Sequence, residues 1–512
     1  MAKRSVQQFS PDVLSRICDH CDRSTLVQLA RTCRAFSIPS FRRIWQTLDG
    51  FAPLFETLPE DALHYYTESL RSWTRVTPMP LSLNLTVLDI NRELTATDLL
   101  RFRIYAPLVR HICWKPSFKP KTVSPHAWHV LDRANPGPLR NLRFLVYREL
   151  QVPDPTRSSP FHSLLGPNLI ALRVSLTRAP PNSYRASASE GVDPTLIDFL
   201  VALPRTCPFL RILEVSVSPP MSRAQRALAD AVCLLPHLTT FSASGIPLLP
   251  RAFCHLSTLP DLKTASWEDY YTGAGPFTPH HVRPFPSLET LAISANTVER
   301  ALALLAVASP PRLVHLTLTL RPAPDPAQFA SLAHALASIP FRPTLELLHI
   351  KFRSRHAPKP EPIPPSAFSP LFSLSRLRDI RIDGHCFVAL NDHALAEMAR
   401  AWPQLRVAHL YEDHSWTAPD APETLPTLPG LVEVSRRCPD IEQLFIMMRD
   451  VRRDDVEAVL ALPPPRVVDA STLAAVSPCA LASLGVGRAA VEEDDVAPLA
   501  AALSLLFRPS GR

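Results

Sequence analysis

The chain has 512 residues, and its 54 lysine and arginine residues against 47 aspartate and glutamate residues give a formal net charge of +7. This length exceeds what one hydrophobic core usually fills, so we expect several domains or one repeating array. With 12 glycines and 56 prolines, the composition disfavours glycine-rich phosphate-binding loops, and the scattered basic residues disfavour a nucleic-acid-binding face.

No segment of the sequence is typical of secretion or of membrane insertion. Residues 1–12 lack the apolar core of a signal peptide, and the longest nearly apolar run, 498–507, is far too short to span a bilayer. The last residues contain no lipidation motif. We therefore expect a cytoplasmic or nuclear protein without a membrane partner, whose cysteines are reduced thiols.

The first fifty residues predict three short helices. Ser10 can cap the first helix, and Pro11 suits its first position. A unit of this size cannot bury all of its apolar side chains by itself, so part of its surface should dock on something else. The predicted apolar faces are Val13, Leu14, Ile17, Cys18 and Cys21 in the first helix, Leu26, Leu29, Ala30 and Cys33 in the second, and Phe36, Phe41, Ile44, Trp45 and Leu48 in the third.

The order and spacing of these residues resemble an F-box. That motif has an apolar residue before a Pro-x-x-Leu helix, a Leu-x-x-Leu helix, a Cys-Arg-x-Phe element and a late tryptophan. The resemblance implies that this segment binds the Skp adaptor of an SCF ubiquitin ligase and, through the adaptor, a cullin. The residues that carry it, and that we expect to contact the adaptor, are Phe9, Pro11, Leu14, Ile17, Leu26, Leu29, Cys33, Phe36 and Trp45.

The Cys18-x-x-Cys21 pair, with His20 between its members, raises the alternative of a zinc site. Structural zinc usually takes four ligands supplied as two pairs, and the chain has no second Cys-x-x-Cys and no His-x-x-x-His. A free cysteine behaves as a small hydrophobic residue, and F-boxes carry leucine or other apolar residues at these positions. Cys33 should lie on the packing face of the second helix. We expect all three thiols to be structural, with no metal bound.

A linker joins this segment to the rest of the chain. Residues 92–114, "RELTATDLLRFRIYAPLVRHICW", pass from a predicted helix, which Thr95 or Thr97 can cap, to a strand. The segment resembles the linker of the large F-box families of mushroom-forming fungi. We assign residues 1–50 to the F-box and residues 51–108 to a helical linker.

The remainder, residues 109–512, repeats one strand phrase, Leu-x-x-Leu-x-[Leu/Ile/Val]. Copies lie roughly 31 residues apart on average, which exceeds the roughly 20–29 residues of leucine-rich repeats and fits inserted loops. Clear copies start at Leu169, Leu210, Leu288, Leu313, Leu345, Leu377, Ile441 and Leu481, and degenerate copies at Val109, Leu142, Leu238, Leu262 and Leu405.

Amphipathic stretches between these phrases, such as 297–308 and 326–338, predict helices. The expected fold class is α/β: a short all-α F-box followed by a leucine-rich-repeat-like solenoid, or horseshoe, of strands and helices. The alternative is an ordinary α/β domain whose sheet is covered on both faces. Four proline-rich inserts, at 180–194, 272–285, 353–370 and 413–429, are either binding loops or variable surface.

The sequence offers little catalytic chemistry. It contains no Gly-x-Ser-x-Gly, His-Glu-x-x-His or P-loop motif, and neither His280-His281 nor the charged run 491–496 suggests a metal site. We expect a non-catalytic receptor that needs no cofactor, whose repeats hold an unknown protein substrate. The alternative is a leucine-rich-repeat scaffold that binds a protein partner without any ligase.

Overall fold

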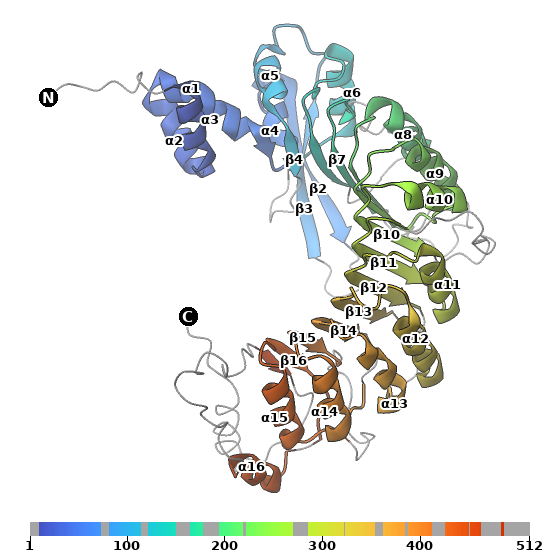
Figure 1. The fold of residues 1–512 in the computed structure, drawn as a ribbon. Helices are drawn as coiled ribbons and strands as arrows, with labels where there is room; N and C mark the ends of the chain where they lie inside the picture. Colours follow the sequence, from blue (N-terminus) through green and yellow to red (C-terminus); the bar gives the residue numbers. More distant parts are fainter. Residues whose placement is uncertain are drawn as a thin grey trace, which may run out of the picture. The chain divides into compact units, whose positions relative to one another are not determined.

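The structure is a computed structural model, shown as a ribbon in Figure 1. It forms two compact units, residues 1–252 and 253–512, which we describe in turn. Phe9, His280-His281 and the run 491–496 lie outside the described residues. The structure describes residues 10–72, 81–113, 121–149, 164–177, 194–218, 222–269, 285–321, 323–353, 362–384, 388–411, 425–449, 451–461 and 483–485.

The first unit begins with the three predicted helices, α1 (Pro11–Asp19), α2 (Arg23–Thr32) and α3 (Arg34–Gln46). The Ser10 side chain accepts a bond from the backbone N–H of Val13 at the start of α1, so it acts as the predicted cap. The prediction that Cys33 lies within the second helix is wrong. Its backbone is extended, with φ −157° and ψ 158°, and it separates α2 from α3.

Two ten-residue strands are the longest elements of the linker, which corrects the prediction of a helical segment over 51–108. After the short helix α4 (Ala52–Phe55), strands β2 (Leu63–Ser72) and β3 (Leu81–Ile90) pair antiparallel. The sequence of β3, "LSLNLTVLDI", alternates apolar and polar residues with the period of a strand. Strand β5 (Lys121–Val123) pairs parallel to β3 and completes a small three-stranded sheet.

Arg92 holds the end of this linker in place. Its guanidinium bridges Asp61, with 2.7 Å between Nη2 and Oδ2, and Asp98, with 2.7 Å between Nη1 and Oδ2. Asp98 also accepts bonds from the backbone and hydroxyl of Thr95. Bonds from Arg92 and Thr95 hold the pKa of Asp98 well below its usual value. Because Thr95 bonds to Asp98, it does not cap helix α5 (Leu100–Tyr105), which begins without a side-chain cap.

The parallel strands of the first unit begin directly after α3. Strand β1 (Thr47–Leu48) pairs with β4 (His111–Cys113), and each later strand pairs in parallel with the one before it. These later strands are β6 (Phe144–Glu149), β7 (Ala171–Thr177), β8 (Ile212–Ser218) and β9 (Thr240–Ser244), and the helices of the region are α6 (Pro125–Ala134), α8 (Pro194–Thr206), α9 (Gln225–Cys233) and α10 (Pro250–Thr258), which reaches into the second unit.

The second unit repeats the same alternation, and its strands from β10 to β17 are parallel, each paired with the next. No helix among the described residues of either unit is long and apolar enough to cross a membrane. The elements are β10 (Thr264–Asp269), β11 (Thr290–Ala295), α11 (Val298–Ala308), β12 (His315–Leu320), α12 (Pro326–Ser338), β13 (Leu347–Phe352), α13 (Pro365–Phe368), β14 (Asp379–Asp383), α14 (Asp392–Ala401), β15 (Val407–His409), α15 (Leu428–Arg437), β16 (Gln443–Phe445), α16 (Arg453–Leu460) and β17 (Ser483–Gly485).

The core of each unit lies between strands and helices. Leu291, Leu316 and Leu348 are register partners on β11, β12 and β13, and all three are 0% exposed. Side chains at alternate positions of β11 and β13 remain half-buried. Helices α8 and α9 lie along one side of the strands of the first unit, and α11 and α12 lie along one side of those of the second (Figure 1). This arrangement is leucine-rich-repeat-like, and it differs from a sheet that helices cover on both faces.

Gly245 occupies a position that only glycine fits. It follows β9 with a φ of +76°, and a Cβ atom there would lie 1.9 Å from the carbonyl oxygen of Val217 at the end of β8. Gly384 occupies the equivalent place after β14, where a Cβ would lie 2.3 Å from the carbonyl oxygen of Phe352. Both glycines let the chain turn away from the sheet against the preceding strand.

A leucine truncation tests whether repeats support each other locally. We expect Leu316→Ala to lower the free energy of unfolding of the second unit by about 2–5 kcal/mol, because the truncation leaves a cavity in the core beside β11 and β13. Hydrogen exchange should rise first in β11, β12 and β13, since each repeat contacts only its neighbours. Leu347→Ala is the control, because Leu347 is half-buried and should cost less. Exchange rising as one block across the unit would contradict the repeat fold.

Candidate functional site

The N-terminal helices expose large apolar side chains. Val13 and Ile17 on α1 are 41% and 39% exposed, and Val27 on α2 is 44% exposed. On α3, Ile38 is 63% exposed and Phe41 is 39% exposed. Residues four apart share a helix face, so Val13 and Ile17 form one apolar strip beside the buried Leu14 and Cys18 stripe. We use the name apolar helix surface for the five exposed side chains on the three helices, which are Val13, Ile17, Val27, Ile38 and Phe41.

The predicted adaptor-binding residues divide between core and surface. Leu14 and Leu26 are 5% and 3% exposed, so they hold the three helices together. Pro11 and Ile17 are exposed, and Ile17 belongs to the apolar helix surface. The sequence pattern therefore identified the helical unit but not which of its faces is free. Half-buried positions are Leu29, Cys33, Phe36 and Trp45, and Phe9 lies outside the described residues.

Trp45 joins the helices to the sheet. Its ring stacks on that of Tyr105, with 4.3 Å between the centroids and 18° between the planes. The ring of Phe41 lies 6.5 Å from the same tyrosine. Only two residues separate Trp45 from the end of β1, so stacking and strand pairing together attach α3 to the sheet.

The cysteines of the opening segment contact protein groups and do not converge. The Cys18 thiol is buried and lies 3.5 Å from the Ser40 hydroxyl on α3. The Cys21 thiol donates to the Ile17 carbonyl oxygen at 3.2 Å. Among the described residues, no group of three or more His, Cys, Asp or Glu side chains is placed to hold a metal ion.

A ladder of residues marks the start of the parallel strands. We call the residue immediately before each strand the strand-start position. Backbone bonds link these positions in order, as from the N–H of Arg143 to the carbonyl of Arg110 and from that of Arg406 to the carbonyl of Arg378. Successive strand-start residues therefore lie side by side along one edge of the sheet in each unit.

In the second unit, charged strand-start residues pair with one another. Lys263 Nζ lies 3.4 Å from the carboxylate of Glu289. Arg378 Nη1 lies 3.7 Å from the carboxylate of Glu346, and Arg406 bonds to Glu442.

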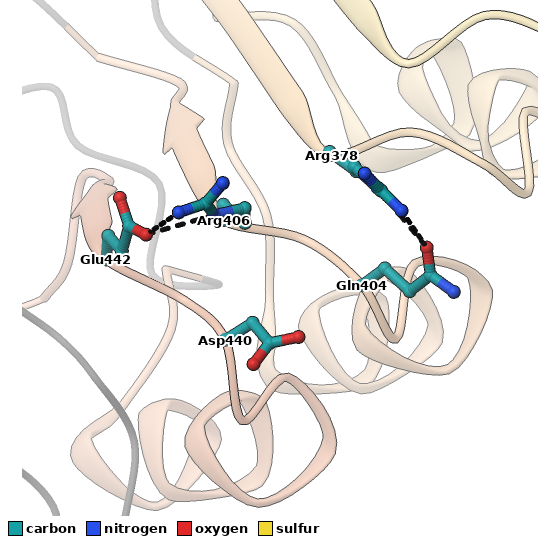
Figure 2. Close-up of a pocket in the computed structure, with 5 residues that line it drawn as sticks. All are labelled: Arg378, Gln404, Arg406, Asp440 and Glu442. Carbon is teal, nitrogen blue, oxygen red and sulfur yellow. Dashed lines mark hydrogen bonds and ion pairs between the residues drawn. The ribbon is translucent and has the colours of Figure 1, made fainter.

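A hollow of about 480 Å³ lies beside the Arg406–Glu442 pair. It is lined by Arg378, Gln404, Arg406, Asp440 and Glu442. Figure 2 shows Arg406 bonded to Glu442 and Arg378 bonded to Gln404, with Asp440 beside them. Two arginines and two carboxylates balance its charge. The hollow therefore carries no net formal charge, and its Arg406 and Glu442 already pair with each other.

Several polar side chains of the second unit lie on the face of the strands opposite the buried leucines. His349 on β13 bonds to Asp383 on β14, and Arg381 makes two bonds of 2.9 Å to Asp379. His409 on β15, the register partner of Arg381, donates a bond of 3.0 Å from Nε2 to Gln443 Oε1.

Burial raises the pKa of Asp383, but the bond from His349 and the nearby positive charges outweigh it. The net effect holds the pKa of Asp383 below its usual value.

Comparisons with known proteins found no family match and a low-scoring structural similarity. No family model matches the chain, and no curated protein matches it. Among solved structures, it is similar to the leucine-rich repeat-containing protein LegL7 from Legionella pneumophila, with 13% sequence identity and a TM-score of 0.27. That match covers 57% of this chain and 98% of LegL7. Because the TM-score is low, the repeat assignment rests on the parallel register and the buried leucines.

Metal analysis tests the structural role of the cysteines. We expect the purified protein to contain no stoichiometric zinc, because Cys18 packs against Ser40 and Cys21, just after α1, bonds to the Ile17 carbonyl oxygen. A double variant, Cys18→Val with Cys21→Leu, should keep the helical content of the wild type. One zinc ion per chain, lost in this variant, would show that the thiols are ligands.

Acid unfolding tests the Asp383 pair. Because the folded-state pKa of Asp383 is depressed, its ionised form stabilises the protein above the unfolded-state pKa of about 4, and this contribution is lost as the pH falls below that value. We expect Asp383→Asn to cost about 1 kcal/mol at neutral pH and to flatten the loss of stability in acid. Urea unfolding across this pH range measures both. Asp261→Asn, at an exposed aspartate, is the control, and equal curves for the two variants would contradict the assignment.

Proposed function

We propose that this protein is the substrate-recognition subunit of an SCF-type ubiquitin ligase. The observation that carries the proposal is the apolar helix surface, formed by Val13, Ile17, Val27, Ile38 and Phe41. Several large apolar side chains exposed on so small a unit are typical of a site of protein association. The F-box resemblance of the same segment supplies the partner, the Skp adaptor, which in turn binds a cullin.

The two ends of the chain have separate tasks in this proposal. The helices α1 to α3 dock on the adaptor, and the strand–helix repeats hold a protein substrate. Catalysis consists of proximity, because a substrate lysine is held where a partner enzyme can transfer ubiquitin to it. The receptor itself needs no catalytic residue and no cofactor, and we propose that it is not an enzyme.

The attachment of the helices to the sheet suits a receptor of this kind. Trp45 stacks on Tyr105, and β1 pairs with β4 only two residues later. A stiff joint keeps the substrate at a defined distance from the adaptor, whereas a flexible tether lowers the effective concentration of the bound lysine. We propose that the protein acts in the cytoplasm or nucleus and without nucleic acid or membrane as a partner.

A repeat scaffold without ligase function is the second candidate. It is favoured by the parallel array alone, because such arrays present long surfaces for protein partners. The two candidates differ in one observable property, which is whether the Skp adaptor and a cullin copurify with the chain.

Two acidic substitutions on α1 test the adaptor interface. We expect a Val13→Asp and Ile17→Asp double variant to lose adaptor capture, because buried interface anchors are each worth roughly 2 kcal/mol or more. The affinity should fall by more than about 100-fold, since each 1.4 kcal/mol corresponds to a factor of ten. Pull-down with purified adaptor, followed by titration, measures the loss.

A matched double variant controls for the introduced charge. Val201 and Leu234 are 53% and 64% exposed and lie in the repeat region, so Val201→Asp with Leu234→Asp should leave adaptor capture unchanged. If both double variants bind as the wild type does, the helices are not the adaptor site. Because the α1 variant keeps its repeats, it should also retain substrates without degrading them, and affinity capture with it would identify them.

A further inference from the structure

Three arginines form an unpaired row on the first unit. Arg110, Arg143 and Arg211 occupy the strand-start positions of β4, β6 and β8, and all three are exposed. Ile170 fills the position between Arg143 and Arg211. We call Arg110, Arg143 and Arg211 the arginine row. Among the residues that the structure describes, none of the three has a carboxylate partner.

Among the described residues of this edge, the turns beside the row supply amides where carboxylates would neutralise it. In the turns that precede these strands, Asn141 and Asn168 donate their side-chain N–H groups to the carbonyls of Pro107 and Arg140. Glu214, on β8, is already paired with Arg173 at 3.1 Å. The second unit differs, because Lys263, Arg378 and Arg406 each have a carboxylate neighbour at equivalent positions.

The positive charge of the row acts on a neighbouring titratable group. Burial lowers the pKa of His111 below its usual value, and the charges of Arg110 and Arg143 lower it further. Adjacent parallel strands lie about 4.8 Å apart, so like charges at neighbouring strand-start positions repel each other. The sequence supplies no compensation for this repulsion within the described part of the chain, which points to a partner that does.

Exposed rings accompany the arginines. Phe144, the residue after Arg143, is 37% exposed and lies edge-on to His111 with 4.8 Å between the ring centroids. Phe209, two residues before Arg211, is 61% exposed. Cationic groups accompanied by exposed apolar rings are complementary to an acidic segment that also carries apolar side chains.

We propose that the arginine row binds an extended, carboxylate-rich segment of a protein partner. Guanidinium groups bind carboxylates through two parallel hydrogen bonds, and the exposed rings of Phe144 and Phe209 offer apolar surface near them. That this partner is the ligase substrate rests on the function proposed above. The binding itself does not require the adaptor.

The dimensions of the row suit such a segment. From β4 to β8 the row crosses three strand spacings, or about 14 Å. An extended peptide advances about 3.3 Å per residue, so five residues with acids at the first, third and fifth positions span about 13 Å. Side chains at these positions point to the same face of an extended chain, whereas the intervening ones point the other way.

A polynucleotide fits less well. Proteins that bind duplex DNA tightly through its backbone typically neutralise about 6–10 phosphates, and the row offers three cations beside a paired Glu214. Single-stranded nucleic acid would also need stacking platforms in series, and Phe144 is already packed edge-on against His111. We therefore assign the row to a protein segment.

Fluorescence anisotropy with a labelled Glu-Leu-Glu-Leu-Glu peptide tests the proposal. The wild-type chain should bind this peptide, and more weakly at high salt, whereas a Gln-Leu-Gln-Leu-Gln peptide should not bind. A triple variant, Arg110→Gln, Arg143→Gln and Arg211→Gln, should bind the acidic peptide about tenfold more weakly, since exposed ion pairs contribute about 0.2–1 kcal/mol each.

The second unit supplies a matched control. Lys263→Gln, Arg378→Gln and Arg406→Gln remove the same charge from equivalent strand-start positions, and peptide affinity should change less than about twofold. Circular dichroism would verify that both triple variants are folded.

Three results would overturn the proposal: no binding of the acidic peptide by the wild type, equal affinities for the wild type and the row variant, or tighter binding of an RNA or phosphoserine peptide through the same arginines. Loss of adaptor capture by the row variant would also overturn it, because the row would then belong to the adaptor interface. Failure of adaptor capture by the wild type, with peptide binding intact, would instead refute only the ligase function.

Discussion

Leucines shared between neighbouring repeats hold this protein together. Leu291, Leu316 and Leu348 are register partners on consecutive strands and are 0% exposed, yet no single repeat encloses any of them. Each strand–helix pair buries its apolar face only when the next pair is in place. The parallel register follows from this constraint, because a slip of one residue would turn every leucine toward the opposite face.

Because the repeats stack in register, residues at equivalent positions of neighbouring repeats lie side by side. They form one continuous edge and one continuous face of the sheet in each unit. Opposite charges gather at the strand-start positions of the second unit, where Arg406 pairs with Glu442. Like charges gather at those of the first unit, where Arg110 precedes Arg143. The same backbone thus provides a self-neutralised edge in one unit and a cationic edge in the other, and the proposed partner surfaces follow from this difference.

Much of the repeat region could be predicted from the sequence, because its signal is local. The strand phrase starting at Leu288 and the helical spacing of 326–338 each lie within one element, and strand β11 and helix α12 form there. The linker strands β2 and β3 were missed although β3 alternates apolar and polar residues. Cys33 was placed in a helix because its apolar spacing continues that of α2, but spacing does not show where the chain breaks between two helices.

Features that depend on register or tertiary contact could not be predicted from single positions. Trp45 matched the F-box pattern, but nothing in its sequence neighbourhood pairs it with Tyr105, sixty residues away. The arginine row emerges only when the strand phrases are aligned on their first leucine, which brings Arg143 and Arg211 to the same position. That alignment is the signal that would have found the row, and the exposed face of α1 has no comparable signal.

Engineered disulfides test the parallel, in-register stack most directly. In a chain whose natural cysteines are replaced, cysteine pairs at 347 and 379 and at 351 and 383 should both cross-link on mild oxidation, since these are register partners on β13 and β14. A pair at 347 and 383 should not cross-link, because four residues along a strand separate its members by about 13 Å. Cross-linking of 347 with 383, and failure of the two register pairs, would contradict the repeat architecture on which the account depends.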